Sequence, residues 1–206
     1  MSVSKGIKAI LVGESAVGKT NLVNIALGGM FQEGTGPNTA SYATKKIMIN
    51  NKNYLCDLWD TTGAKSFRSV NKIMIKDSKI ILIIFDITFR DSFDQANFWY
   101  NYAKEILGED GYIIALVGNK SDLNDERKVS DEEIKKKAEE FKIKYIVTSA
   151  KNDGENFKKF LSELLEDYIN KYYPEEVKTN ETSETIKIGE NQKKDKNQKS
   201  KNKCKN

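Results

Sequence analysis

A glycine-rich segment near the N-terminus has the residue types and the spacing needed to hold phosphate. Residues 13–20 read GESAVGKT, which matches the pattern G-x-x-x-x-G-K-[ST] in full. Lys19 is expected to reach the β- and γ-phosphates of a nucleotide, and the Thr20 hydroxyl is expected to bind Mg²⁺. The loop residues whose backbone we expect to curl around the phosphates are Gly13, Ser15, Ala16, Val17 and Gly18. The segment predicts a nucleoside triphosphate site without specifying the base.

Two later segments predict that the base is guanine. Residues 119–122 read NKSD and residues 148–151 read TSAK. The carboxylate of Asp122 can accept two hydrogen bonds from N1 and N2 of guanine, whereas N1 of adenine is itself an acceptor and would repel it. The amide of Asn119 addresses the O6 and N7 edge.

The remaining residues of these two segments are expected to complete the base site. The stem of Lys120 can lie along the plane of the ring, and the backbone N–H of Ala150 can add a bond to O6. Ser149 and Lys151 flank Ala150 in the same segment. An isolated NKSD is more often an ordinary turn, but here it follows one apolar strand and TSAK follows the next.

A third segment predicts how a metal ion is held. Asp60 ends the strand-like run YLCDLW and is placed to hold Mg²⁺ through water, and Gly63 is placed to offer its N–H to a γ-phosphate. The competing interpretation of Asp60 is a turn or helix cap. It is disfavoured once Lys19 and Thr20 have placed the ion.

The elements that position these residues alternate along the chain. Runs typical of strands occupy residues 7–12, 44–49, 54–59, 79–86, 113–119 and 144–149. Helical patterns cover residues 19–27, 92–107, 130–142 and 156–173. This alternation predicts an open, mostly parallel α/β sheet, with runs 44–49 and 54–59 forming a hairpin at one edge and helices on both faces. Ligands bind beyond the carboxyl ends of the strands in such sheets.

Composition limits the class of protein. The chain has 206 residues, two cysteines and no histidine, which excludes a disulfide framework and any histidine-based catalysis. We expect one domain over residues 1–174 and a disordered lysine-rich tail over residues 175–206. Counting Lys and Arg against Asp and Glu, that tail carries a net charge of +3 and the rest +1. A nearly neutral body argues against nucleic acid as a partner.

The motifs together resemble those of the Ras superfamily of small GTPases, and most of all its Rab branch. GESAVGKT, DTTG, NKSD and TSAK occur in the order of that family, over about residues 5–173. Residues 55–61 (LCDLWDT) and 85–93 (FDITFRDSF) give the Rab-like character. The resemblance implies the P-loop small GTPase fold, bound GTP or GDP with Mg²⁺, and Phe31 as the aromatic residue against the guanine.

The resemblance also implies partners and a location. Effector, exchange-factor and activating proteins are expected to bind regions 32–46 and 61–75. A GTP/GDP switch of this kind acts in vesicle-mediated intracellular transport, in the cytoplasm, as a peripheral protein on the cytosolic face of an endomembrane. The aromatic residues Tyr42, Trp59 and Phe67 are candidates for an effector-binding patch, and Trp59 can equally be a packing residue at the sheet edge.

The catalytic segment departs from the family pattern. The family has D-T-A-G-Q where this chain has Asp60-Thr61-Thr62-Gly63-Ala64. The expected catalytic positions are Lys19, Gly63 and Ala64. In the family, the residue at the position of Ala64 normally orients the attacking water. A methyl group neither donates nor accepts a hydrogen bond. The prediction is therefore slow intrinsic hydrolysis, with an activating protein able to supply a polar group.

The first switch and the tail depart as well. About one residue is missing from QEGTGPNTASYATKK, and Thr35 and Thr39 are the nearest hydroxyls to the position that senses Mg²⁺. Either the loop presents Thr39, the better candidate of the two, or γ-phosphate sensing is weakened. Cys204 is third from the end of the sequence, outside the usual prenylation patterns. Either one lipid on Cys204 acts together with the nearby lysines on a membrane, or the tail is simply solvated.

Three functions remain to be separated. The first is a switch with slow GTPase chemistry, and the second is a guanine-nucleotide-binding scaffold with little or no turnover, which Ala64 and the altered switch favour. The third is a P-loop kinase, which is disfavoured because NKSD and TSAK would have no role there.

Overall fold

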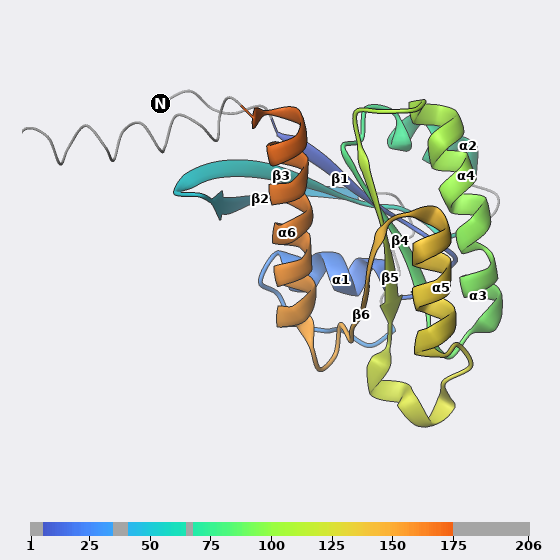
Figure 1. Cartoon of the computed structure of the whole chain (residues 1–206). Helices are drawn as coiled ribbons and strands as arrows, with labels where there is room; N and C mark the ends of the chain where they lie inside the picture. The colour runs from blue at the N-terminus through green and yellow to red at the C-terminus, as the bar shows by residue number, and fades with distance from the viewer. Residues whose placement is uncertain (1–5, 35–40, 65–67, 175–206) are drawn as a thin grey trace, which may run out of the picture. The chain divides into compact units, whose positions relative to one another are not determined.

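The computed structural model of the chain describes residues 6–34, 41–64 and 68–174 (Figure 1). It divides into two compact units, Met1–Tyr168 and Ile169–Asn206. In the second unit the described residues continue helix α6 to Tyr172, and the N–H of Tyr173 donates to the carbonyl of Ile169 at 2.7 Å. No helix in the described part of the chain combines the length and the apolar character required to cross a membrane.

The first unit is built on a six-stranded sheet with the strand order β2-β3-β1-β4-β5-β6. The strands are β1 (Ile7–Val12), β2 (Ser41–Ile49), β3 (Lys52–Asp60), β4 (Ile80–Asp86), β5 (Ile113–Asn119) and β6 (Lys144–Val147). β2 pairs antiparallel with β3, and every other neighbouring pair is parallel. The prediction of a mostly parallel sheet with one antiparallel edge strand is confirmed.

Burial explains why the central strands are so apolar. All seven residues of β4 are buried, and six of the seven in β5 are. A parallel strand covered by helices on both faces has no solvent side on which to place polar residues. In β3, by contrast, only alternate residues are buried, and β2 is exposed over most of its length.

Helices cover both faces of the sheet. They are α1 (Lys19–Ala26), α2 (Arg68–Ile75), α3 (Arg90–Asp94), α4 (Ala96–Leu107), α5 (Asp131–Phe141) and α6 (Gly154–Tyr172), with a 3₁₀ helix η2 (Ser121–Glu126). Figure 1 shows α2, α4 and α5 on one face of the sheet and α1 on the other. On the first face, Met74, Trp99 and Ile134 from these helices join one apolar core with Ile81 and Leu116 of the sheet.

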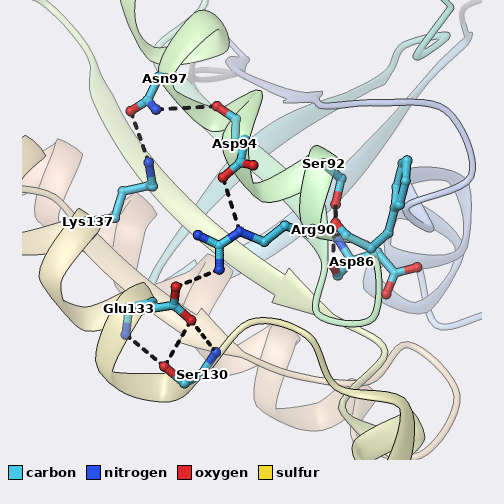
Figure 2. Close-up of polar contacts among 9 residues, drawn as sticks. Asp86, Arg90, Ser92, Asp94, Asn97, Ser130, Glu133 and Lys137 are labelled. Atoms are coloured by element: carbon cyan, nitrogen blue, oxygen red, sulfur yellow. Dashed lines mark hydrogen bonds and ion pairs between the residues drawn. The ribbon is translucent and has the colours of Figure 1, made fainter.

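Polar contacts on the surface fix α5 against α3 and α4 (Figure 2). Arg90 pairs with Asp94 at 3.3 Å and with Glu133 at 2.5 Å. Glu133 also belongs to a capping box, in which its carboxylate accepts from the backbone N–H of Ser130 at 3.0 Å. The amine of Lys137 donates to Asn97 at 3.0 Å. These contacts join the helices that flank β4 and β5.

Several elements differ from the prediction. The pattern over 92–107 is two helices, α3 and α4, which meet at Gln95 even though that residue keeps right-handed helical angles. Helix α2 and the 3₁₀ helix η2 were not predicted. Strand β6 ends at Val147 rather than at residue 149, and the hydroxyl of Ser149 instead donates to Asp122.

Candidate nucleotide-binding site

The phosphate-loop sequence forms the connection between β1 and α1, as predicted. Gly13 and Gly18 have φ angles of +144° and +97°, which residues with a side chain rarely adopt. A Cβ at Gly13 would lie 2.1 Å from the carbonyl oxygen of Ile84, and one at Gly18 would lie 2.2 Å from the amide nitrogen of Asn119. No side chain among the described residues caps the start of α1. Its first N–H groups are therefore directed at the space that a phosphate would occupy.

Lys19 is buried in this loop. Its amine donates to the carbonyl of Gly13 at 3.0 Å and to that of Glu14 at 2.7 Å. Burial lowers the pKa of Lys19 to about 8, and the negative charges of Asp60 and Glu14 oppose that shift. A buried cation of this kind is costly without an anion beside it, so the loop is prepared for a negatively charged ligand.

Thr20 and Asp60 form the place where a metal ion would be held. The Thr20 hydroxyl donates to Oδ2 of Asp60 at 2.7 Å. The other carboxylate oxygen, Oδ1, is buried and has no hydrogen-bond partner among the described residues. Burial raises the pKa of Asp60, whereas the Thr20 hydrogen bond and the charge of Lys19 act in the opposite direction.

These donors fit Mg²⁺. A buried carboxylate oxygen without a partner beside a threonine hydroxyl offers the hard oxygen ligands that this ion prefers. The described residues contain no group of three His, Cys, Asp or Glu side chains able to hold a metal. An ion bound here would therefore need phosphate oxygens and water to complete its coordination, as Mg²⁺ in nucleotide sites does.

The segment Asp60–Ala64 lies directly against the phosphate loop. The buried hydroxyl of Thr61 donates to the carbonyl of Leu11 at 2.7 Å, which fixes the start of the segment. A Cβ at Gly63 would lie 2.2 Å from the backbone of both Glu14 and Ser15. A glycine is therefore required for this approach. Ala64 follows, partly buried, with a methyl group as its side chain.

Asn119 connects three loops at the ends of the strands. Its side-chain amide donates to the carbonyl of Val17 at 2.9 Å, and its side-chain oxygen accepts from the backbone N–H of Ala150 at 3.1 Å. Asn119 is buried. The structure thus joins the phosphate loop to the NKSD and TSAK segments through one side chain, at the carboxyl edge of the sheet.

Asp122 is held by the TSAK segment. The hydroxyl of Ser149 donates to Oδ1 of Asp122 at 2.5 Å, and it accepts from the N–H of Lys151 at 3.1 Å and from that of Asn152 at 3.0 Å. Ser149 therefore supports both the carboxylate and the turn that follows it. Phe31 is partly buried, and the amine of Lys151 lies 5.9 Å from the centre of its ring. Phe31 thus lies beside the TSAK segment.

Lys120 has a partner that the sequence analysis missed. Its amine pairs with Oδ2 of Asp86 at 2.6 Å. Oδ1 of Asp86 accepts from the N–H of Thr88 at 2.8 Å and from its hydroxyl at 2.7 Å. Asp86 ends β4 directly beside Asn119, which ends β5. A carboxylate at the end of an otherwise apolar strand was the signal that could have identified it.

Other expected residues lie outside the described part of the chain. They are Thr35 and Thr39 of the first switch, Phe67 of the aromatic patch, and Cys204 with the tail 175–206. The other two aromatic candidates are in contact, since the rings of Tyr42 and Trp59 stack at 5.0 Å. Tyr42 is 64% exposed, and the amine of Lys8 lies 4.4 Å from the centre of a Trp59 ring. The stacked pair therefore presents an aromatic surface at the β2–β3 edge.

The fold and the site together define a P-loop nucleotide-binding protein with guanine-type base motifs. The model of the Ras family matches residues 8–171. Over 161 residues the chain is 35% identical to the Ras-related protein Rab-11C of Dictyostelium discoideum, covering 76% of this chain and 71% of that one. It is also 35% identical over 166 residues to Rab-2B of the same organism, covering 77% and 80%. The chain belongs to the Ras family, as a Rab-like small GTPase.

Proposed function

We propose that this protein is a GTP/GDP switch of vesicle-mediated transport whose own hydrolysis of GTP is slow. The observation that carries this proposal is the position of Ala64, directly after a glycine that lies against the phosphate loop. A side chain at position 64 would lie next to the γ-phosphate and the attacking water. The methyl group present there has no polar atom with which to orient that water.

The other residues of the site have the roles that phosphoryl transfer requires. Lys19 and the N–H groups of residues 15–20 bind the β- and γ-phosphates and stabilise the charge that develops on the transferred group. The N–H of Gly63 donates to the γ-phosphate. Mg²⁺, held by Thr20 and Asp60, neutralises charge on the phosphate oxygens when it is bound. Binding of GTP is therefore expected to be tight even though turnover is slow.

Single-turnover hydrolysis tests this proposal. The full chain, loaded with GTP and Mg²⁺, is compared with Ala64→Gln and with Ala64→Leu, which adds bulk without a hydrogen-bonding group. We expect slow hydrolysis in the native chain, hydrolysis faster by roughly tenfold or more in Ala64→Gln, and no gain in Ala64→Leu. Equal acceleration in both variants would contradict the role given to the missing polar group.

The second candidate is a guanine-nucleotide-binding scaffold without turnover. Ala64 favours it, as does the altered first switch, in which Thr39 is the residue we assign to sensing Mg²⁺. If neither the native chain nor Ala64→Gln hydrolyses GTP while both retain the nucleotide and Mg²⁺, the scaffold replaces the enzyme. A first switch unable to place the metal would then be the second defect.

Partners and location follow from the same proposal. Effector, exchange-factor and activating proteins would bind regions 32–46 and 61–75, and Tyr42 of the first region, stacked on Trp59, offers an aromatic contact. The lysine-rich tail and a prenylated Cys204 would hold the protein on the cytosolic face of an endomembrane. Loss of membrane association in a Cys204→Ser variant, measured by fractionation, is the expected result. Unchanged association would leave the tail without a lipid.

A further inference from the structure

A pocket of about 280 Å³ lies beside the edge strand β2, away from the nucleotide site. Three of its apolar residues are buried, namely Ala26 at the end of α1, Ile47 of β2 and Leu161 of α6, and a fourth, Met48 of β2, is exposed. Within β2, Ile47 is opposite Tyr54, whereas Ser41 is opposite Asp60 of the metal site. The pocket thus belongs to the hairpin end of the strand, and nothing in the nucleotide chemistry above uses it.

The strand beside the pocket has an unpaired edge among the described residues, since β2 is the end strand of the sheet. The β2–β3 hairpin turns through Asn50 and Asn51, both with positive φ, which is the type I′ geometry. The residues flanking such a turn form a hydrogen-bonded pair, and such pairs alternate along the strands. Lys46 and Met48 are therefore non-bonded positions relative to β3, and their N–H and C=O groups face outward at the pocket.

The rim of the pocket is basic. Lys45, Lys46 and Lys158 line it, and none of the described lining residues is acidic. The amine of Lys45 donates to the carbonyl of Ala26, and that of Lys158 pairs with Glu155 at 2.6 Å. Each amine has three donors, so both retain capacity for a further acceptor.

The lowered pKa of Glu155 indicates that the surroundings of the pocket are positively charged. Its pKa is lowered, first by the hydrogen bond from Lys158 and then by the positive charges of Lys158, Lys159 and Lys45. A carboxylate in this neighbourhood is thus stabilised in its charged form. A second carboxylate brought to the pocket would meet the same field.

We propose that the hairpin end of β2 binds an extended acidic segment of a partner protein, which adds a strand at Lys46 and Met48 and places one apolar side chain in the pocket. Pairing with the strand edge supplies main-chain hydrogen bonds, and the pocket selects a side chain. Acidic residues two positions before and after the apolar one lie on the same face of the added strand and meet Lys45 and Lys158. The inference is independent of whether the protein hydrolyses GTP.

An anionic lipid surface is the competing occupant of a basic rim. The peptide is favoured because a bilayer would not pair with the outward N–H and C=O groups of Lys46 and Met48. The pocket also contains three buried apolar residues, Ala26, Ile47 and Leu161, which fits a single apolar side chain. The two occupants give different outcomes in the test.

The test uses the full chain loaded with GDP and three blocked heptapeptides. The first reads Thr-Glu-Val-Phe-Val-Glu-Thr, the second has Lys in place of both Glu, and the third is the acidic peptide with its pairing amides methylated. Binding is followed through the backbone amide signals of Lys46 and Met48 and through their hydrogen exchange. Only the acidic, unmethylated peptide is expected to shift these signals and slow the exchange.

Charge reversal identifies the lysines involved. The double variant Lys45→Glu with Lys158→Glu is expected to lower the affinity for the acidic peptide by roughly tenfold. Lys158→Gln alone is expected to lower it by about threefold. Reversal of Lys135 and Lys136, two exposed lysines of α5, is the matched control and should leave the affinity unchanged. Retained GDP binding shows that each variant is folded.

Several results would overturn the proposal. They are no amide shift at millimolar peptide, equal binding of the acidic and basic peptides, equal binding of the methylated peptide, or equal weakening by the control reversal. Vesicles of phosphatidylserine that shift the pocket signals while the acidic peptide does not would assign the site to lipid instead. None of these results bears on the GTPase test, because GDP-loaded protein is used throughout.

Discussion

We expect base discrimination to depend on one carboxylate, that of Asp122, which is held in place by Ser149. Asp122 offers acceptors to a base, and the hydrogen bond from Ser149 leaves it acceptor capacity on both oxygens. Guanine has donors at N1 and N2, which match a carboxylate. Xanthine has a carbonyl at position 2, which matches an amide.

Asp122→Asn is therefore expected to change the base preference of the site from guanine to xanthine. GTP affinity should fall about a hundredfold or more, because hydrogen-bonding groups of the base and of residue 122 are left mismatched, and xanthosine triphosphate should bind better than GTP. Competition with a fluorescent guanine nucleotide measures both. Asp125→Asn, an exposed carboxylate in the same 3₁₀ helix, is the control and should change neither. A loss of affinity for both nucleotides would indicate that Asp122 supports the loop rather than the base.

The pair between Asp86 and Lys120 gives a second prediction at this scale. Asp86→Asn keeps an acceptor for Thr88 but removes the charge that holds the lysine stem in position. We expect nucleotide dissociation to become several-fold faster with little change in thermal stability. Stopped-flow release of a fluorescent GDP analogue measures it, with the exposed Asp77→Asn as the control. An unchanged release rate would mean that Lys120 does not depend on Asp86.

At the scale of elements, the start of α5 is the best-defined helix terminus. The Ser130 hydroxyl accepts from the N–H of Glu133, whose carboxylate accepts from the N–H of Ser130. Ser130→Ala is expected to lower the free energy of unfolding by about 1 kcal/mol, since a capping hydrogen bond is lost. Chemical denaturation measures the change. Ser130→Thr keeps the hydroxyl and should lose much less, and equal losses would point to packing instead.

The same capping box makes the stability of the folded protein depend on pH. The hydrogen bond from the backbone of Ser130, followed by that from Arg90, lowers the pKa of Glu133 to about 2. Because the folded pKa lies below the unfolded one, this contribution is complete above pH of about 4.5 and is lost as the pH falls toward about 2. Glu133→Gln should therefore flatten the acid side of the stability curve. An unaltered slope between those values would contradict the assignment.

The sequence predicted some helices and strands accurately and missed others. Strands 7–12 and 113–119 have the predicted bounds, because both faces are buried and the apolar run ends where the burial ends. Helix α2 was missed because its eight residues make only about two helical turns, which are too few for a helical repeat of apolar residues to be recognised. Its position depends on contact with α4. In the site, motif spacing identified Asn119 and Asp60. The carboxylate of Asp86 at the end of an apolar strand is visible in the sequence, but its pairing with Lys120 depends on the register of β4 against β5, which no local pattern contains.

At the scale of the whole molecule, Cys56 reports on the integrity of the sheet. It is fully buried in β3, and burial raises the pKa of its thiol to about 12. Thiolate is the reactive form, so the native protein should protect this residue strongly. In the full chain with Cys204→Ser, iodoacetamide labelling should be at least about a hundredfold slower than in denaturant. Labelling at comparable rates would show that β3 opens readily.

The position of Asn119 between the two ends of the site affects how a nucleotide would dissociate. Its two hydrogen bonds, to Val17 and to Ala150, tie the phosphate end of the site to the base end. Two regions that share a buried side chain lose their contacts together, so binding at one end lowers the cost of ordering the other. Guanosine and pyrophosphate, offered as separate fragments, should therefore each bind more tightly when the other is present. A protein that catalyses exchange then needs to displace only one end for both to open.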